Sequence, residues 1–228
     1  MDINEHMLNR TLERAQEKAV KDFIKIHKAD FNKWQPSTQF NIILANQSLH
    51  HVMELEHLFD SIAKGLTETG LFLTSDMIGR NGHMRWPEAL EALKPLWDEV
   101  NPQYKFNQML KRQEDEYINH DCSTEGFEGI RAQDILKLLL ERFNFELFIP
   151  FANIIMVFID RPFGHNFDVN NPDDIDFIDR VHFKDEELML AGILKPTQMI
   201  AAMTKAEVTE TKLINPKLTP QFCIREID

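Results

Sequence analysis

The chain has 228 residues, 43% of them hydrophobic, which suffices for one substantial core with an elaboration. It carries 37 acidic and 25 basic residues, and its formal net charge of -12 repels phosphate backbones, so we expect no nucleic-acid partner. It shows no apolar run of the roughly 20 residues that cross a bilayer, no signal peptide and only two cysteines. These features predict a cytoplasmic protein without membrane contact.

The first predicted element is a helix or helix pair within residues 5–28. Met7, Leu8 and Leu12 begin an apolar stripe at steps of three and four residues. Residues 23–29 alternate between apolar and polar side chains instead, which predicts a short strand ending near Asp30.

The next segment has the pattern of a strand, a helix and a second strand. Residues 40–45 form a nearly continuous apolar run, typical of a strand that is covered on both faces of a parallel sheet. Residues 53–69 have the apolar spacing of an amphipathic helix that Gly70 would end, and residues 71–74 are apolar again. Short connections between these elements predict a right-handed parallel crossover unit.

Residues 78–130 interrupt this alternation. They are rich in Trp, Pro, Asn, His and Arg, and only residues 87–100 have the pattern of a helix. A long irregular segment between sheet elements usually covers an active site, so we expect a substrate-covering insertion here.

The sheet pattern resumes with a helix over 131–143 and two strands, 145–150 and 154–159, joined closely enough for an antiparallel hairpin. After an irregular loop at 163–167, for which we favour a structural role, a helix capped by Asn171 should end before Pro196. The predicted division is an α/β domain at 1–160 and a C-terminal helical extension with a loose tail at 161–228.

Four stretches resemble consecutive parts of the Rossmann-like class I methyltransferases, over roughly two thirds of the chain. They are residues 2–4, 29–31, 41–52 and 71–77, which look like the ends of the second and third strands, the fourth strand with its loop, and the fifth strand. The resemblance implies a doubly wound α/β sheet, mostly parallel with a C-terminal antiparallel hairpin. The family's first strand and glycine-rich turn would precede Asp2, so we expect an N-terminally truncated sheet.

The resemblance implies S-adenosylmethionine as the cofactor. In the family, an acidic residue after the second strand binds the ribose hydroxyls, the end of the third strand meets the adenine, and the loop after the fourth strand passes the methionine portion. The positions that match are Asp2, Ile3, Asp30, Phe31, Asn46, Gln47, Leu49 and His51.

The stretch 76–87 follows the fifth strand and is the best candidate for substrate contacts. Two arginines could hold a carboxylate or phosphate, a histidine could act as a general base, and a tryptophan could form an apolar wall. The substrate candidates are Asp76, Arg80, Arg85 and Trp86, and the candidate bases are His83 and His50. The alternative is a structural loop whose arginines pair with acids such as Glu88. A second polar cluster, 121–131, could close over the same pocket.

No metal site is predicted. His50 and His51 are adjacent, and neighbouring side chains on an extended segment point in opposite directions. The sequence contains neither a His-x-x-x-His nor a Cys-x-x-Cys spacing.

The predicted function is methyl transfer from S-adenosylmethionine to a small or medium-sized acceptor. The alternative is a non-catalytic module whose pocket serves as an interaction surface, and another nucleotide-binding enzyme such as a dehydrogenase is a weaker third. The expected partners are a small-molecule substrate and a second copy or another protein at an unpaired sheet edge.

Overall fold

The computed structural model describes residues 1–226. Its strands are β1 (Phe40–Asn46), β2 (Leu66–Met77), β3 (Phe106–Asn107), β4 (Arg112–Gln113), β5 (Asn144–Phe151), β6 (Gln198–Thr204) and β7 (Lys212–Leu213). Its α-helices are α1 (Glu5–Glu17), α2 (Leu55–Gly65), α3 (Pro87–Glu99), α4 (Ala132–Leu140), α5 (Ile155–Ile159), α6 (Pro172–Leu190) and α7 (Pro220–Cys223). Short 3-10 turns are η1 (Lys21–Phe23), η2 (Leu49–His51), η3 (Asn81–His83), η4 (Pro102–Lys105), η5 (Cys122–Glu125) and η6 (Gly164–Asn166).

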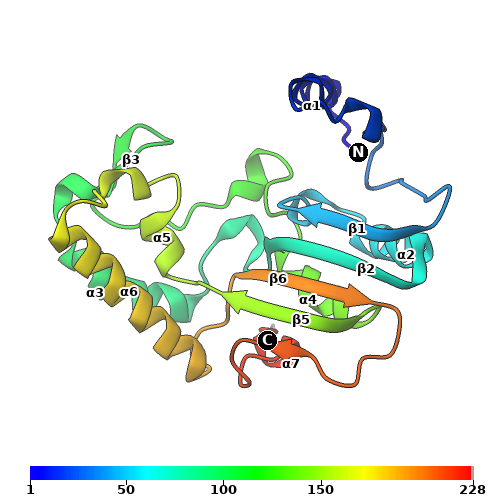
Figure 1. Ribbon diagram of the computed structural model, residues 1–228. Helices are drawn as coiled ribbons and strands as arrows, with labels where there is room; N and C mark the ends of the chain where they lie inside the picture. The colour runs from blue at the N-terminus through cyan, green and yellow to red at the C-terminus, as the bar shows by residue number, and fades with distance from the viewer. Residues whose placement is uncertain (227–228) are drawn as a thin grey trace.

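The main sheet has the order β1-β2-β6-β5-β7 (Figure 1). The pairs β1–β2 and β5–β7 are parallel, whereas β2–β6 and β5–β6 are antiparallel. The predicted α/β class is confirmed, but the sheet is mixed rather than mostly parallel. The predicted crossover from β1 through α2 to β2 is present, although the helix ends at Gly65 instead of Gly70.

The predicted hairpin of 145–150 with 154–159 is wrong. Residues 155–159 form α5, and the antiparallel neighbour of β5 is β6, which lies much later in the chain. A short apolar run does not distinguish a buried strand from a buried helix. Here Asp185 of α6 accepts hydrogen bonds from the backbone N–H groups of Asn153 and Ile154, at 2.7 and 3.0 Å, and so caps the start of the helix.

The C-terminal third belongs to the sheet, contrary to the predicted division at residue 160. It supplies β6 and β7, and the expected loose tail packs against the core through Leu218 and Cys223, which are both buried. The sequence predicted no strand in this region, and only the structure shows that β6 inserts between β2 and β5.

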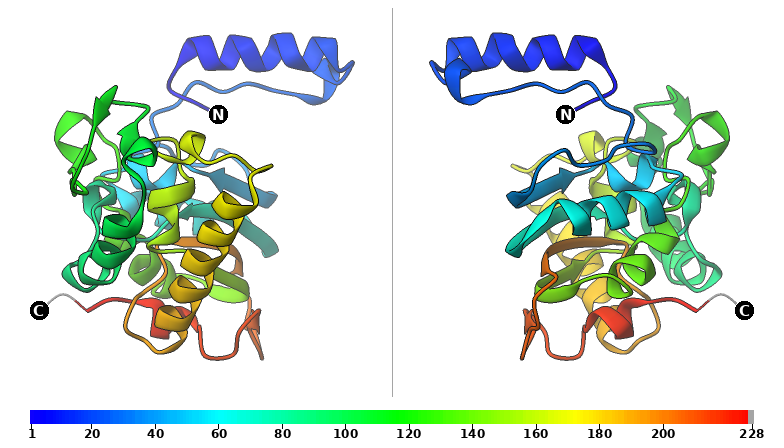
Figure 2. Two further views of the ribbon diagram at one scale, coloured as in Figure 1. Left: turned by 90° about the vertical axis from the view of Figure 1, so that its left-hand side faces the viewer. Right: turned by 90° about the vertical axis from the view of Figure 1, so that its right-hand side faces the viewer.

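The N-terminal segment stands apart from the sheet (Figures 1 and 2). The helix α1 forms as predicted, and the Asn4 side chain accepts a hydrogen bond from His6 N–H at its start. The predicted strand at 23–29 is reduced to one parallel bridge between Asp2 and Lys28.

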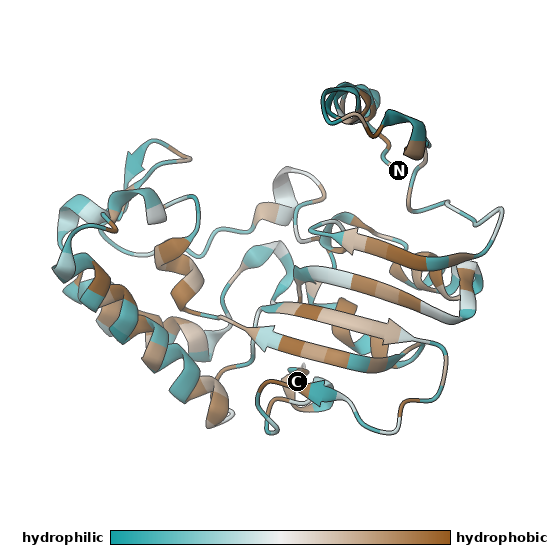
Figure 3. Ribbon diagram, in the orientation of Figure 1, coloured by the Kyte–Doolittle hydropathy of each residue, from teal (hydrophilic) through white to brown (hydrophobic). Residues whose placement is uncertain are grey.

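Two hydrophobic cores hold the rest together. The first lies between one face of the sheet and the helices α2 and α4, and the second joins α3, α5 and α6. The opposite face of β1 is open, with Ile42 57% and Leu44 67% exposed, so the prediction that β1 is covered on both faces is wrong (Figure 3). Among residues 1–226, no helix combines the length and apolar character that a membrane crossing requires.

Candidate functional site

A cavity of about 360 Å³ lies beyond the carboxyl end of β2, beside the start of β6. Its wall comes from four parts of the chain: 77–85, 107–128, 156–163 and 197–198. The first two belong to the predicted insertion, and Glu128 and Cys122 come from the second polar cluster, so both clusters do border one cavity. The third part includes Phe163, from the loop for which a structural role was favoured.

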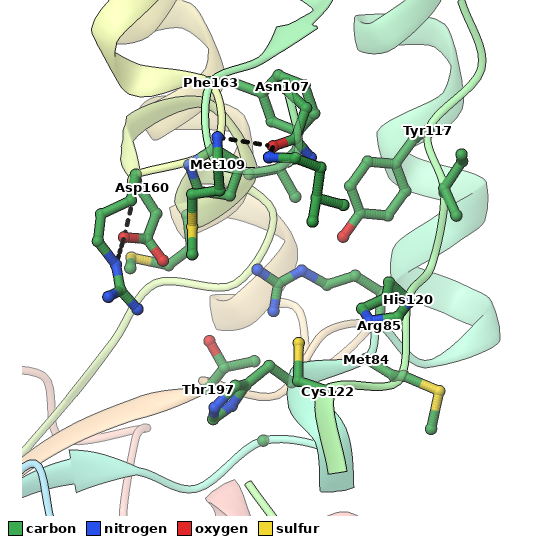
Figure 4. A pocket seen from close by; sticks show the side chains of 18 of the residues that line it. Met84, Arg85, Asn107, Met109, Tyr117, His120, Cys122, Asp160, Phe163 and Thr197 are labelled. Carbon is green, nitrogen blue, oxygen red and sulfur yellow. Dashed lines mark hydrogen bonds and ion pairs between the residues drawn. The ribbon is translucent and has the colours of Figure 1, made fainter. Parts of the chain in front are cut away.

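The wall combines methionine and aliphatic side chains with a few polar groups. Its apolar members are Met77, Met84, Met109, Leu110, Ile118, Met156, Val157 and Phe163. The Arg85 side chain extends into the middle of this space, between Tyr117 and Thr197 (Figure 4). Burial raises the pKa of the Tyr117 phenol, which keeps it protonated.

Arg85 is the cation best placed to meet a ligand. Its Nε atom is buried without a hydrogen-bond partner, and among residues 1–226 no carboxylate oxygen lies within ion-pair distance of it. Arg80 also borders the cavity, but its Nη1 donates to the Arg85 carbonyl at 3.0 Å, which fixes the loop.

Trp86 does not line the cavity. Two guanidinium groups contact its ring, that of Arg80 at 5.1 Å and that of Arg225 at 4.2 Å from the ring centre. Glu88 accepts a hydrogen bond from Arg225 Nε at 2.8 Å, so it pairs with neither arginine of the predicted substrate stretch. The aromatic ring therefore supports the loop from behind.

Asp76 lies under the loop that follows β1, fully buried and outside the cavity. Its Oδ2 accepts hydrogen bonds from the backbone N–H groups of Ser48 and Leu49, both at 2.8 Å, and its Oδ1 lies 2.6 Å from Nδ1 of His50. Burial raises the pKa of Asp76. The hydrogen bond from His50, the charge of its ring and the backbone N–H groups of Ser48 and Leu49 together outweigh burial and hold this pKa below its usual value. Asp76 therefore positions this loop rather than touching a substrate.

Three histidines meet at Glu128. Its Oε1 lies 2.9 Å from His83 Nε2 and 3.6 Å from His50 Nε2, and its Oε2 lies 3.6 Å from His51 Nδ1. His83 and Glu128 line the cavity, while His50 is only 3% exposed behind them. Burial lowers the pKa of His83 despite the Glu128 bond. Burial raises the pKa of Glu128, but the His83 bond and the nearby histidines bring it below the usual value.

Backbone hydrogen bonds connect the segments that carry this cluster. Gly82 N–H donates to the Gly129 carbonyl at 2.9 Å, and Ile130 N–H donates to the His50 carbonyl at 3.0 Å. His83 itself has a φ of 57°, a left-handed conformation that costs free energy in a non-glycine residue. The surrounding contacts thus hold His83 in a strained conformation that points toward Glu128.

The predicted cofactor residues all lie outside the cavity. Asp2 and Asp30 are brought close because Ala29 N–H donates to the Asp2 carbonyl. The Oδ1 atom of Asp2 accepts a hydrogen bond from the Asn4 N–H at 2.8 Å, and the Oδ1 atom of Asp30 accepts one from the Asn32 N–H at 3.0 Å. The hydrogen bonds from Asn32 lower the pKa of Asp30 and keep it ionised.

The loop after β1 divides into exposed and buried positions. Asn46 is exposed at the end of the strand, and Gln47 has a left-handed φ of 47°. Leu49 belongs to the first core, whereas His51 remains 44% exposed at its side chain. Ile3 is exposed beside Asp2, and Phe31 packs against the first core.

A family model described as a methyltransferase domain matches residues 1–144. The chain belongs to this methyltransferase family. The match covers β1, β2 and the whole cluster around Glu128, and it confirms the resemblance inferred from the four sequence stretches. No curated protein matches the sequence.

Among solved structures, the O-methyltransferase from a trans-AT PKS multienzyme of Brevibacillus brevis, in complex with S-adenosyl-L-homocysteine, is 17% identical with a TM-score of 0.46. The match covers 97% of this chain and 60% of that one. Geranyl diphosphate C-methyltransferase from Streptomyces coelicolor is 10% identical, with a TM-score of 0.47, and the match covers 90% and 62% of the two chains. Both TM-scores lie below 0.5. The chain spans 36% of the length of an S-adenosylmethionine-dependent methyltransferase from Clostridium acetobutylicum.

Proposed function

We propose that this chain takes part in methyl transfer from S-adenosylmethionine to a small or medium-sized acceptor. The observation that carries the proposal is the cavity beyond the carboxyl end of β2, where the Arg85 side chain and a histidine–carboxylate cluster face an apolar wall. Ligands of doubly wound sheets bind at this end of the strands. Membership of the methyltransferase family supplies the reaction class.

The donor set outside the cavity fits the cofactor's chemistry. The carboxyl oxygens of Asp2 and Asp30 are acceptors suited to hydroxyl and amino groups, and each side chain makes its protein hydrogen bonds through one oxygen, Oδ1. Asn46, Gln47 and His51 offer polar groups along the exposed loop. We assign the ribose side to Asp2 with Ile3, the adenine side to Asp30 with Phe31, and the methionine side to the loop that Leu49 anchors.

On the acceptor side, Arg85 would hold an anionic or carbonyl group and the methionine-rich wall would hold the apolar body. Arg80 would act by fixing the Arg85 backbone, and Trp86 and Asp76 by supporting the loops. An acceptor with a carboxylate or phosphate next to an apolar group matches this combination.

When bound, S-adenosylmethionine supplies an electrophilic methyl group on sulfur. His83 or His50 would take the proton of the acceptor's nucleophilic atom, so that a lone pair on that atom becomes available for methylation. Glu128 beside His83, and Asp76 beside His50, would stabilise each imidazolium. Bringing the two reactants into line would provide most of the rate.

The test is calorimetric titration of S-adenosylhomocysteine into the chain. We expect binding that Asp30→Asn and Asp2→Asn each weaken about tenfold, since each removes one charge-assisted hydrogen bond. Asp22→Asn is the matched control, because Asp22 is an exposed acid of the same N-terminal segment. Absence of binding to the wild-type chain, or equal binding by all variants, would reject the assigned cofactor site.

A second candidate, a non-catalytic interaction module, is favoured by β1, an edge strand with one open face on which Ile42 and Leu44 are exposed. Such a module would bind a second copy or another protein there. Turnover of any acceptor by the chain would exclude a purely non-catalytic role.

A further inference from the structure

We propose that His50, His83 and Glu128 form a binding site for one divalent transition-metal ion of the zinc type, with an open coordination position toward the cavity. The ligand atoms would be Nε2 of each histidine and a carboxylate oxygen. Two imidazoles and one carboxylate are a donor set that zinc and related ions use when they retain a position for substrate.

The ligand atoms already have the separation that an ion requires. All three lie within 4.8 Å of one another, with His83 Nε2 at 2.9 Å and His50 Nε2 at 3.6 Å from Glu128 Oε1. Metal–ligand bonds of about 2.1 Å in tetrahedral geometry place neighbouring ligand atoms roughly 3.4 Å apart. Small side-chain rotations therefore suffice, and the backbone can stay where it is.

The ring of His50 is oriented as a metal ligand would be. Its Nδ1 lies 2.6 Å from Asp76 Oδ1, and Asp76 is itself fixed by the amides of Ser48 and Leu49. A carboxylate on one ring nitrogen directs the proton there and leaves the lone pair of the other nitrogen for the ion. That other nitrogen, Nε2, is the one that faces Glu128.

The three ligand segments form one rigid frame. The Gly82–Gly129 hydrogen bond joins the segment of His83 to that of Glu128, and the Ile130–His50 hydrogen bond joins the latter to η2. A Cβ on Gly129 would lie 2.9 Å from Cε1 of His83, so the glycine lets this ring come close. A site preorganised in this way loses little conformational entropy on binding an ion.

The site lies at the cavity wall, because His83 and Glu128 both line the cavity. A donor atom of the acceptor would complete the coordination, and the ion would then assume the activating role that we assign to imidazole in the metal-free protein. Only this catalytic consequence rests on the proposed function; metal binding itself does not.

The experiment is titration of the chelator-treated full chain with Co²⁺, followed by visible absorption, and with Zn²⁺ and Mg²⁺ by calorimetry. We expect one Co²⁺ or Zn²⁺ per chain, bound at least about 100-fold more tightly than Mg²⁺, which prefers oxygen ligands. His83→Gln and Glu128→Gln should each abolish the Co²⁺ spectrum. Asp76→Asn should weaken binding about 10- to 100-fold.

His57→Gln is the matched control, since Nε2 of His57 in α2 donates to the Trp34 carbonyl and His57 is not part of the cluster, so this change should leave the affinity as it is. X-ray absorption of the Co²⁺-loaded wild-type chain provides a test that needs no variant, and should show two imidazole ligands. Failure of wild-type protein to bind Co²⁺, unchanged binding by His83→Gln, or equal affinity for Mg²⁺ would overturn the proposal. The metal titrations contain no S-adenosylhomocysteine. If the chain fails to bind S-adenosylhomocysteine in the separate test of the cofactor site, the result of the metal titrations is therefore unaffected.

Discussion

Among single residues, Glu56 and Arg131 make a two-pronged ion pair that connects α2 to the start of α4. Arg131 Nη1 and Nη2 lie 2.7 and 2.8 Å from the two carboxylate oxygens. The Arg131 hydrogen bonds hold the pKa of Glu56 at about 2, against an ordinary 4.5. Both side chains are partly exposed, so solvent screening limits the stabilisation to about 1 kcal/mol.

We expect Glu56→Gln to lower the free energy of unfolding by about 1 kcal/mol near neutral pH. Because the folded pKa is depressed, this stabilisation is present above the ordinary pKa and disappears as the pH falls through about 2. Urea unfolding across this range measures the difference between variant and wild type. Glu54→Gln, an exposed neighbour, is the control, and a pH-independent difference would contradict the expectation.

On the scale of elements, Asp185 connects α6 to α5. Its carboxylate is buried and accepts from three successive backbone N–H groups, those of Asn153, Ile154 and Ile155. Burial raises the pKa of Asp185 above its ordinary 3.8, even though these amides oppose the shift. The acid therefore helps to decide that residues 155–159 form a helix.

We expect Asp185→Ala to destabilise the fold by about 3 kcal/mol, because buried donors would lose their acceptor. Asp185→Asn keeps one acceptor oxygen and should lose less. Since the folded pKa is raised, the stability from Asp185 is full below the unfolded pKa and is lost as the pH rises through the folded value.

The stability advantage of wild type over Asp185→Asn should therefore shrink as the pH rises above the ordinary pKa of 3.8. Urea midpoints of both proteins at several pH values provide the measurement. Asp179→Asn, an exposed acid on the same helix, should show no such trend. An advantage that grows with pH would mean that Asp185 is stabilised as the anion.

For the whole molecule, β1 is an edge strand of the sheet, and it carries two exposed apolar side chains, Ile42 and Leu44, on its open face. Unpaired, apolar edge strands tend to pair with other chains. We expect Leu44→Lys to reduce concentration-dependent association, measured by light scattering during size-exclusion chromatography. Ile214→Lys changes an even more exposed residue outside β1 and should have no effect. The same apparent mass for wild type and Leu44→Lys over a wide concentration range would exclude association through β1.

The sequence by itself determined the α/β class, the crossover through α2 and the stretch that borders the cavity. These depend on local spacing of apolar residues and on short connections, which are readable along the chain. It did not reveal β6, because residues 198–204 become the centre of the sheet only through pairing with β2 and β5, far away in sequence. For the same reason, residues 154–159 were predicted as a strand although residues 155–159 form α5: a short apolar run contains no local signal that separates the two structures.

In the candidate site, too, some residues can be selected from the sequence and others only from the tertiary structure. Arg85, His83 and His50 could be selected because polar residues gather after a predicted strand. Glu128 could not, since one glutamate in a loop has no distinguishing pattern until folding brings it to His83. Likewise, only the tertiary structure shows that Asp76 is buried under a loop, because its role depends on backbone N–H groups 26 to 28 residues away. Local pattern fixes which elements form, whereas hydrogen bonding between distant segments decides which side chains meet.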